Sequence, residues 1–436
     1  MTTSTKSFVR NDMLQPMAPP VSQAGAVRWV RENLFSSPLN TVLTLLGVAI
    51  LYWLISASLP WWLNSVWNAN SLGECRAIVT ASAGEGATGA CWAMVRERWH
   101  QFLFGFYPSP LYWRPILAFV LLFVALAPVL FTALPRKMVW FTLLYPFLAF
   151  WLLWGGSIWT PIIGLLGFVV IAGVFSALNA RLGVPMAMGV GILAAVLFWL
   201  FLSEPIASTL QSIIPLAIEK VNSDQFGGFL LAITIGVTAI AFSLPIGVLL
   251  ALGRQSDMLI VKSLSVGFIE FIRGVPLITL LFTASLLLQY FLPPNTTFDL
   301  ILRVIILVTF FAAAYIAEVV RGGLAALPRG QYEAADALGL DYWKAQRHII
   351  LPQALKISIP GIVSTFIGLF KDTTLVSFVG LADPLRGITA IVRADINWKG
   401  IYWEPYIFVG AIFFIFCFSM SRYSMYLERK LKTDHR

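Results

Sequence analysis

Long apolar runs constrain this chain more than any other feature of its sequence. Many of them reach the ~20 residues that an α-helix needs to cross the hydrocarbon core of a bilayer. The chain is 58% hydrophobic and 12% charged, whereas a soluble protein carries roughly twice that charged fraction. Lipid offers the backbone no hydrogen-bond partner, so each run must be a helix. The sequence therefore predicts an all-α polytopic membrane protein.

We expect about ten transmembrane helices, because the apolar runs are separated by polar or Gly/Pro-containing segments. The predicted crossings lie at Leu39–Leu63, Trp113–Leu134, Val139–Gly156, Ile162–Leu178, Val184–Ser203, Gly227–Leu250, Val275–Leu292, Leu300–Val320, Ile357–Gly380 and Pro405–Ser421.

The distribution of lysine and arginine predicts the orientation of these helices. With the N-terminus inside, ten crossings return the C-terminus inside, and about twenty Lys and Arg residues then face the cytoplasm against about eight outside. We therefore expect a multi-pass protein of the bacterial inner (cell) membrane with both termini cytoplasmic. The net charge of +9 follows from this bias and indicates no nucleic-acid partner.

The sequence predicts two halves joined by a polar connector, and the second half carries every motif. The expected parts are a cytoplasmic tail (1–38), an N-terminal membrane extension of about five helices (39–203) with an outer loop (64–112), an outer connector (204–226), a core (227–425) with a cytoplasmic loop (321–356), and a basic cytoplasmic tail (426–436).

Two cysteines, Cys75 and Cys91, fall in the predicted outer loop. An oxidising exterior favours a disulfide, which would close a Gly/Ala-rich loop and stabilise it by ~3 kcal/mol. Two free thiols remain the alternative. No histidine or second cysteine pair lies nearby to complete a zinc site, so we expect no metal.

The most specific motif lies between the eighth and ninth apolar runs. It consists of Glu333-Ala334-Ala335, three residues, Gly339, nine residues, Ile349, one residue and Leu351-Pro352.

The residues around this motif predict two short helices. We expect the first over Glu333–Leu338, after a turn at Pro328-Arg329-Gly330 and before a stop at Gly339. Asp341 is expected to cap the second helix, which Pro352 would end or kink. From these residues alone, a soluble connector that only joins two membrane helices remains an alternative.

The spacing resembles the cytoplasmic "EAA loop" of bacterial ABC importer permeases. The resemblance implies a helix that docks on a separate ATP-binding-cassette ATPase dimer, so that ATP and Mg²⁺ are bound by the partner and no cofactor by this chain. The implied ATPase-coupling residues are Glu333, Ala334, Ala335, Leu338, Gly339, Ile349, Leu351 and Pro352.

Three further clusters, at 268–277, 314–323 and 369–375, resemble the polar amino-acid subfamily of these permeases. Segments 89–93 and 102–108 resemble a narrower group, the membrane subunits of general L-amino-acid importers. The resemblance implies a MetI-like permease core that imports L-amino acids. It also implies a second, different permease subunit and a periplasmic amino-acid-binding protein as partners.

Two adjacent charges, Lys371 and Asp372, lie in the middle of the ninth predicted crossing. A lone charge at a helix centre costs about 2.5–3.5 kcal/mol on insertion scales, so both cannot face lipid. We assign them, with Thr373, to the translocation path or gate. An ion pair that only fixes packing is the alternative.

Two further charged pairs have one-turn spacing. Glu318 and Arg321 are expected to pair on one helix face, and Glu270 and Arg273 share that spacing on the inner side. We place all four in the translocation path or gate, with a purely structural role as the alternative for each pair.

The sequence contains no Gly-x-x-x-x-Gly-Lys-[Ser/Thr] phosphate loop and no catalytic constellation of side chains. We therefore expect a transport subunit and no catalytic residue. An ABC permease for another small polar solute, such as an opine or organic acid, stays open at this point. So do an ion-coupled secondary transporter that uses Lys371 and Asp372, and a membrane anchor that only assembles a complex.

Overall fold

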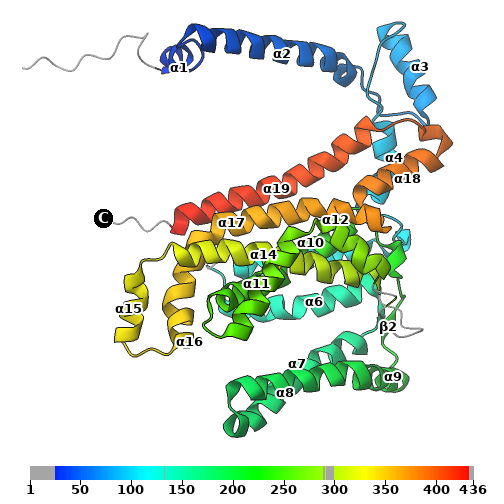
Figure 1. Ribbon diagram of the computed structural model, residues 1–436. Helices are drawn as coiled ribbons and strands as arrows, with labels where there is room; N and C mark the ends of the chain where they lie inside the picture. Colours follow the sequence, from blue (N-terminus) through cyan, green and yellow to red (C-terminus); the bar gives the residue numbers. More distant parts are fainter. Residues whose placement is uncertain (1–24, 132, 288–289, 291–298, 432–436) are drawn as a thin grey trace, which may run out of the picture. The chain divides into compact units, whose positions relative to one another are not determined.

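The computed structural model describes residues 25–131, 133–287, 290 and 299–431. The chain divides into two compact units, residues 1–93 and 94–436. Figure 1 shows that both are built of helices. The only strands among the described residues are β1 (Gly156–Ser157) and β2 (Ala217–Ile218), which pair antiparallel.

The first unit contains three described helices: α1 (Gly25–Asn33), α2 (Pro38–Leu63) and α3 (Leu72–Ala83). The helix α1 lies within the segment predicted as a tail. Ser37 begins α2, because its hydroxyl accepts a hydrogen bond from the Asn40 N–H at 3.2 Å. Every residue of α2 is at least partly exposed, as expected for an apolar helix surrounded by lipid.

The loop after α2 is tied together by a disulfide. Cys75 on α3 is bonded to Cys91, with 5.9 Å between their Cα atoms, and both are buried. A short bridge pairs Cys91 with Val66, and Trp92 stacks on Trp67 with 5.6 Å between ring centroids. The disulfide and the aromatic contacts therefore hold the same point of the loop.

The helices of the second unit include several short 3₁₀ and π-helical turns, labelled η. In chain order the elements are α4 (Ala93–Phe104), η2 (Ser109–Leu111), α5 (Trp113–Leu130), η3 (Arg136–Met138), α6 (Val139–Trp154), α7 (Trp159–Leu182), α8 (Val184–Leu197), η4 (Phe198–Leu202), α9 (Ser203–Ile213), η5 (Ser223–Gln225), α10 (Gly228–Gln255), α11 (Leu259–Gly274), α12 (Leu277–Phe282), η6 (Thr283–Leu287), α14 (Leu300–Ala325), α15 (Arg329–Ala337), α16 (Tyr342–Ala345), η7 (Gln346–Ile350), α17 (Leu351–Asp372), η8 (Thr373–Val379), α18 (Pro384–Ala394), η9 (Ile396–Trp398) and α19 (Trp403–Leu431).

The centre of the second unit is α14, which packs against α10 and α17 (Figure 1). Over half, 56%, of its most apolar stretch is buried, the largest share among the candidate spans of the described residues. Small residues permit this packing: at Gly323 the backbone of α14 closely approaches Ala354 and Ser358 of α17. The Ser358 hydroxyl donates to the Val319 carbonyl at 3.3 Å.

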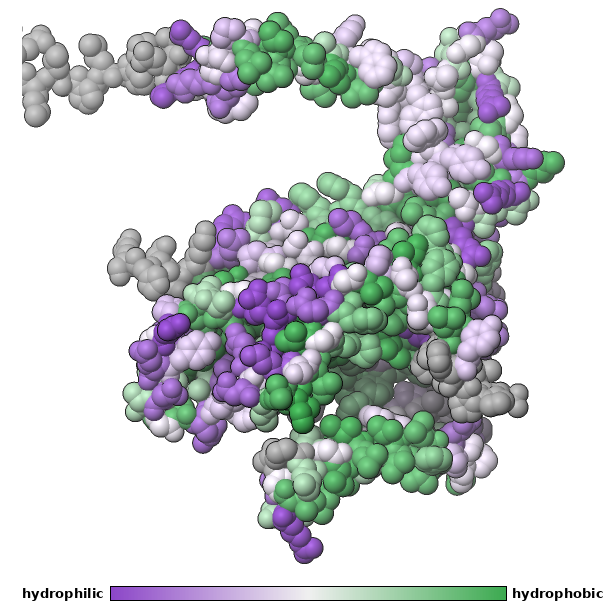
Figure 2. Space-filling model, in the orientation of Figure 1, coloured by the Kyte–Doolittle hydropathy of each residue, from purple (hydrophilic) through white to green (hydrophobic). Residues whose placement is uncertain are grey.

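The helices α7 and α8 form an apolar pair at the periphery of the second unit. Their surface is largely hydrophobic (Figure 2), with exposed Ile192, Leu193 and Val169. A helix with so much apolar surface in contact with solvent is unfavourable in water and stable in lipid.

Within the described residues, nine helices are long and apolar enough to cross a membrane. The pair Leu259–Gly274 and Leu277–Leu287, which is bent by 103°, makes a tenth if it counts as one span. The all-α polytopic fold is therefore confirmed. Of the seventh predicted crossing, Val275–Leu292, the short helical stretch Leu277–Leu287 follows this bend, and the last part lies partly outside the described residues.

The ninth crossing differs from its predicted bounds. The helix α17 begins at Leu351 and ends at Asp372, and 3₁₀ turns follow. The Thr373 and Thr374 hydroxyls donate to the carbonyls of Phe370 and Lys371, at 2.7 and 2.9 Å. Lys371 and Asp372 therefore lie at the end of an α-helix and not in its middle.

We predict that Gly323→Ala destabilises the second unit and that Gly322→Ala does not. A Cβ at Gly323 would lie 2.1 Å from the Ser358 Oγ and 2.5 Å from the Ala354 carbonyl oxygen, whereas nothing lies within 4 Å of one at Gly322. The expected loss in the free energy of unfolding is about 1–3 kcal/mol for Gly323→Ala. Thermal unfolding in detergent measures it, and equal midpoints for the two variants would contradict the packing described.

Candidate functional site

The segment that carries the EAA-like motif folds into a helical hairpin. We define the hairpin as α15, the turn 338–341, α16 and η7. Gly339 ends α15 with a φ of +68°, a left-handed conformation that suits glycine. Its N–H donates to the Asp336 carbonyl at 2.9 Å, and the Leu340 N–H donates to the Ala335 carbonyl at 3.2 Å.

The second helix of the hairpin begins at Asp341. The carboxylate accepts a hydrogen bond from the Lys344 N–H at 2.9 Å, and the Lys344 ammonium lies 2.9 Å from the other oxygen. These hydrogen bonds from Lys344 hold the pKa of Asp341 below its ordinary value. The carboxylate is therefore ionised at neutral pH, the form that best caps a helix N-terminus.

Two details of the hairpin differ from the prediction. The helix α15 already begins at Arg329, because Pro328 occupies the capping position, where its missing N–H is not needed. Pro352 lies beyond the second helix of the hairpin, whose segments α16 and η7 end at Ile350. It lies in the first turn of α17, directly after the π-helical turn η7, and proline is tolerated there.

The predicted coupling residues divide into a buried and an exposed group. Ala335 is buried, and Ile349 and Leu351 are half-buried and face the membrane helices. The exposed residues are Glu333, Ala334, Leu338, Gly339 and Pro352.

The tip of the hairpin presents apolar side chains to solvent. Leu338 is 72% exposed, Trp343 65% and Tyr342 52%, and the two rings meet edge to face at 5.3 Å. We call these three residues the hairpin tip. Figure 1 shows α15 and α16 beyond the ends of α14 and α17. An exposed apolar cluster on a projecting element is typical of a protein-binding surface.

The base of the hairpin is joined rigidly to the membrane helices. Gln353 Nε2 donates to Gln331 Oε1 and to the Ile349 carbonyl, both at 2.9 Å. Below this link lies one apolar cluster shared by α10, α11, α14, α17 and the hairpin. Its buried members are Ala251, Leu252, Ile269, Ile316, Ala317, Val320, Leu324, Leu327, Ile350, Ala354 and Ile362.

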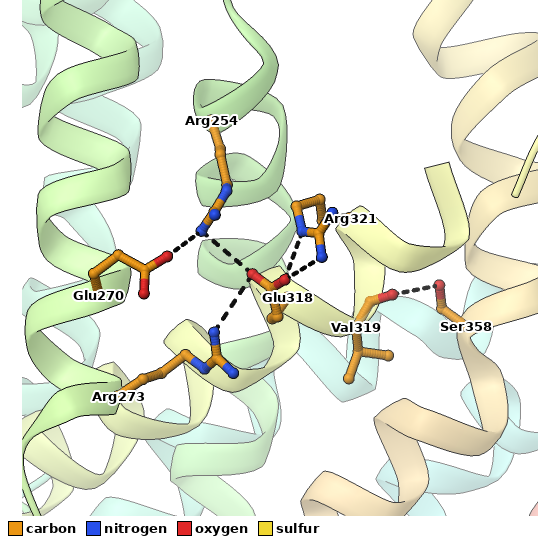
Figure 3. Close-up of polar contacts among 7 residues, drawn as sticks. All are labelled: Arg254, Glu270, Arg273, Glu318, Val319, Arg321 and Ser358. Atoms are coloured by element: carbon orange, nitrogen blue, oxygen red, sulfur yellow. Dashed lines mark hydrogen bonds and ion pairs between the residues drawn. The ribbon is translucent and has the colours of Figure 1, made fainter. Parts of the chain in front are cut away.

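Five charged side chains from three helices meet beside this apolar cluster (Figure 3). We call Arg254 of α10, Glu270 and Arg273 of α11, and Glu318 and Arg321 of α14 the charge cluster. Glu318 is its centre: Arg321 Nε donates to Oε1 at 2.6 Å, and Arg254 Nη1 donates to Oε2 at 3.3 Å. Arg273 Nη1 lies 3.6 Å from the same Oε2.

Within the charge cluster, one ion pair joins residues of the same helix and the others join different helices. Glu318 and Arg321 are paired on one helix, but Glu270 accepts a hydrogen bond from Arg254 at 2.7 Å. Among the described residues, Glu270 and Arg273 form no ion pair with each other. Arg273 instead lies over the Tyr315 ring at 5.5 Å. Three arginines share two carboxylates, so the cluster carries a formal charge of +1.

Sequence reasoning missed Arg254 as a member of this cluster. It is a single basic residue in the last turn of α10, 16 residues before Glu270 and 64 before Glu318. A basic residue is common at a helix end, so no local pattern distinguishes it.

The residues Lys371, Asp372 and Thr373 lie apart from the charge cluster. Lys371 is exposed, Asp372 half-buried and Thr373 fully buried. Within the part of the chain that the structure describes, no ion pair joins Lys371 to Asp372 or either of them to the charge cluster. The described residues also contain no group of three or more His, Cys, Asp or Glu side chains that could hold a metal ion.

Comparison with known proteins identifies the family. Residues 243–433 match the family "Binding-protein-dependent transport system inner membrane component". The chain is 71% identical over 433 residues to the glutamate/glutamine/aspartate/asparagine transport system permease protein BztC of Rhodobacter capsulatus, covering 99% of this chain and 100% of that protein. The chain belongs to the amino-acid ABC transporter permeases. It is thus a multi-pass inner-membrane permease of an amino-acid ABC importer.

A second relative agrees with this assignment. The inner membrane amino-acid ABC transporter permease protein YhdY of Escherichia coli is 40% identical over 411 residues, 94% of each chain. A solved amino-acid ABC transporter structure with histidines is 30% identical, covers 46% of the permease and 91% of its own chain, and has a TM-score of 0.42.

We predict that Glu318→Gln destabilises the permease more than Glu270→Gln does. Without the Glu318 carboxylate, the three guanidinium groups would lie together with Glu270 as their one remaining anion. We expect this to lower the free energy of unfolding by about 2 kcal/mol. Glu270 is 54% exposed, and an exposed pair contributes about 1 kcal/mol or less. Thermal unfolding in detergent at low ionic strength measures both variants. A larger effect for Glu270→Gln would show that Glu318 is not the centre of the cluster.

Proposed function

We propose that the hairpin tip is the contact through which a partner ATPase dimer drives this permease. ATP and Mg²⁺ would be bound and hydrolysed by the partner, because the chain has no phosphate-binding loop of its own. The single observation that carries the proposal is the exposed cluster Leu338, Tyr342 and Trp343 on a hairpin whose base is fixed to the membrane helices.

The base of the hairpin supports a mechanical role. Apolar contacts and the Gln353–Gln331 hydrogen bond at 2.9 Å join the hairpin to α14 and α17. A movement of the tip would therefore be passed to these helices and not absorbed by a flexible connector. Nearly inverting a two-state population needs about 5.5 kcal/mol of differential binding, which closure of an ATP-loaded dimer could supply.

The charge cluster is proposed as a gate element at the same end of the membrane helices. Its ion pairs between helices connect α10, α11 and α14, so a relative movement of these helices must break or exchange them. Partly exposed ion pairs can exchange at a small cost. The cluster would thus favour a few discrete arrangements of the three helices. Lys371, Asp372 and Thr373 remain proposed members of the path, on the evidence of their place in α17 and η8.

We further propose that the transported substrates are glutamate, glutamine, aspartate and asparagine, the substrates that the name of the 71% identical relative gives. The complete assembly would contain a second, different permease subunit and a periplasmic amino-acid-binding protein. Both termini would face the cytoplasm, which places the hairpin on the side where the ATPase is. The core (227–425) would form the path, and residues 39–203 an additional membrane extension.

We predict that Leu338→Asp releases the ATPase while the permease still assembles in the membrane. A charge at the centre of an apolar contact must be desolvated without a partner, so we expect at least a tenfold loss of bound ATPase. The amount of ATPase that co-purifies in mild detergent is the measurement. Ile396→Asp is a matched control, because Ile396 is 86% exposed and lies at the other end of the membrane helices. Wild-type ATPase content in Leu338→Asp would contradict the proposed contact.

The substrate range is tested by ATP-dependent uptake of labelled L-glutamate into vesicles that contain the complete complex. We expect excess glutamine, aspartate and asparagine to compete, and arginine and leucine not to. Competition by arginine or leucine at equal concentration would overturn the proposed substrate range, and so would the absence of glutamate uptake. Neither result bears on the proposed ATPase contact, which the Leu338→Asp variant tests separately.

A further inference from the structure

A buried arginine near the start of α14 plays no part in the sites described so far. Arg303 lies one turn from the N-terminal end of α14, at the opposite end from the hairpin, and is only 7% exposed. Its neighbours Ile301 and Val304 belong to the apolar core of the second unit. An arginine near a helix end normally extends its charge to water, and Arg303 does not.

The buried positive charge of Arg303 has few hydrogen-bond or charged partners. Nη1 donates to the Ser285 carbonyl of η6 at 2.9 Å, and Nε is buried without a hydrogen-bond partner among the described residues. The guanidinium group forms no ion pair with another described residue. The nearest acidic residue in the sequence, Asp299, caps α14 by accepting from the Leu302 N–H at 3.0 Å. The segment 288–298 contains no Asp or Glu.

A second buried arginine, Arg114 of α5, has more partners than Arg303. It is 3% exposed, donates to the Glu219 carbonyl at 2.6 Å, and lies 5.7 Å from the centroid of the Trp113 ring. Its Nε, like that of Arg303, is buried without a hydrogen-bond partner among the described residues. Arg114 thus has an aromatic ring in addition to a backbone carbonyl, whereas Arg303 has the carbonyl alone.

A buried charge without a counter-ion is unfavourable by several kcal/mol, and intramembrane charges usually mark functional sites. The partner of Arg303 also points to a site. The turn η6 is π-helical, a geometry frequent at functional sites, and it ends the bent pair in which Leu277–Leu287 follows Leu259–Gly274 at 103°. In transporters, broken helices of this kind line the substrate path.

We propose that Arg303 binds the α-carboxylate of the transported amino acid. The guanidinium fork matches a carboxylate through two parallel N–H···O bonds, and the free Nε supplies a donor for this contact. The α-carboxylate is the anionic group that all four proposed substrates share, so the inference rests on the proposed function. Arg303 is covered by η6 in this structure, and the substrate reaches it when η6 and α14 separate.

The test is direct binding of labelled L-glutamate and L-glutamine to the purified membrane complex without its binding protein, so that only the permease selects. We expect Arg303→Met to weaken both affinities about 10- to 100-fold, the range for loss of a charged hydrogen-bond pair, and Arg303→Lys to weaken them less. Arg114→Met is the matched control, with wild-type affinity in the fraction that assembles.

A ligand whose α-carboxylate is converted to an amide completes a thermodynamic cycle. The wild-type complex should bind this amide about 10-fold or more weakly than glutamine, and Arg303→Met should bind the two equally. Equal discrimination in the wild type and Arg303→Met would overturn the inference, as would a loss restricted to glutamate. If Arg303→Met does not assemble, the same cycle with Arg303→Gln decides, because this side chain is polar but carries no charge, and undiminished discrimination there has the same meaning. If the wild-type complex binds none of the four amino acids, the proposed substrate range fails instead.

Discussion

The close packing of α14 between α10 and α17 is the contact on which the rest of the permease core depends. It is possible because Gly323 brings the backbone of α14 against Ala354 and Ser358. In lipid, helices gain little from burying apolar surface, so close van der Waals contact and interhelical hydrogen bonds, such as that of Ser358 to the Val319 carbonyl, carry the association. The same helix then leads directly into the hairpin, and α14 therefore joins the proposed motor contact to the membrane path.

Polar groups in the core are placed where this packing leaves room for them. The charge cluster lies at the end of α14 near the hairpin, with side chains that are partly exposed, and Glu318 is the anion shared by three arginines. Arg303 lies near the other end, buried and almost unpaired. One end of the helix thus holds charges that compensate one another, and the other holds a charge that a substrate carboxylate would compensate.

Much of the architecture could be predicted, because apolar runs of sufficient length have one stable form in lipid, and the motif spacing identified the hairpin. What could not be predicted depended on contacts between distant segments. One-turn spacing suggested equivalent pairs at Glu318–Arg321 and Glu270–Arg273, but Glu270 pairs with Arg254 of another helix. Hydropathy continued the ninth helix past Asp372, although threonine hydroxyls bonded to preceding carbonyls turn it into a 3₁₀ segment. Pro352 suggested the end of the second hairpin helix or a kink in it, but the π-helical turn η7 already ends at Ile350, and Pro352 lies in the first turn of α17.

The central claim is that the hairpin moves with the partner ATPase and carries the membrane helices with it. Pulsed electron paramagnetic resonance on the assembled complex tests this most directly, with spin labels at Arg347 of the hairpin, outside the hairpin tip, and at Ile396 of η9, both exposed positions. The account predicts that the distance distribution between the labels shifts to a second, discrete population when the ATPase binds a non-hydrolysable ATP analogue. An unchanged distribution in a complex shown to be active in transport would contradict it.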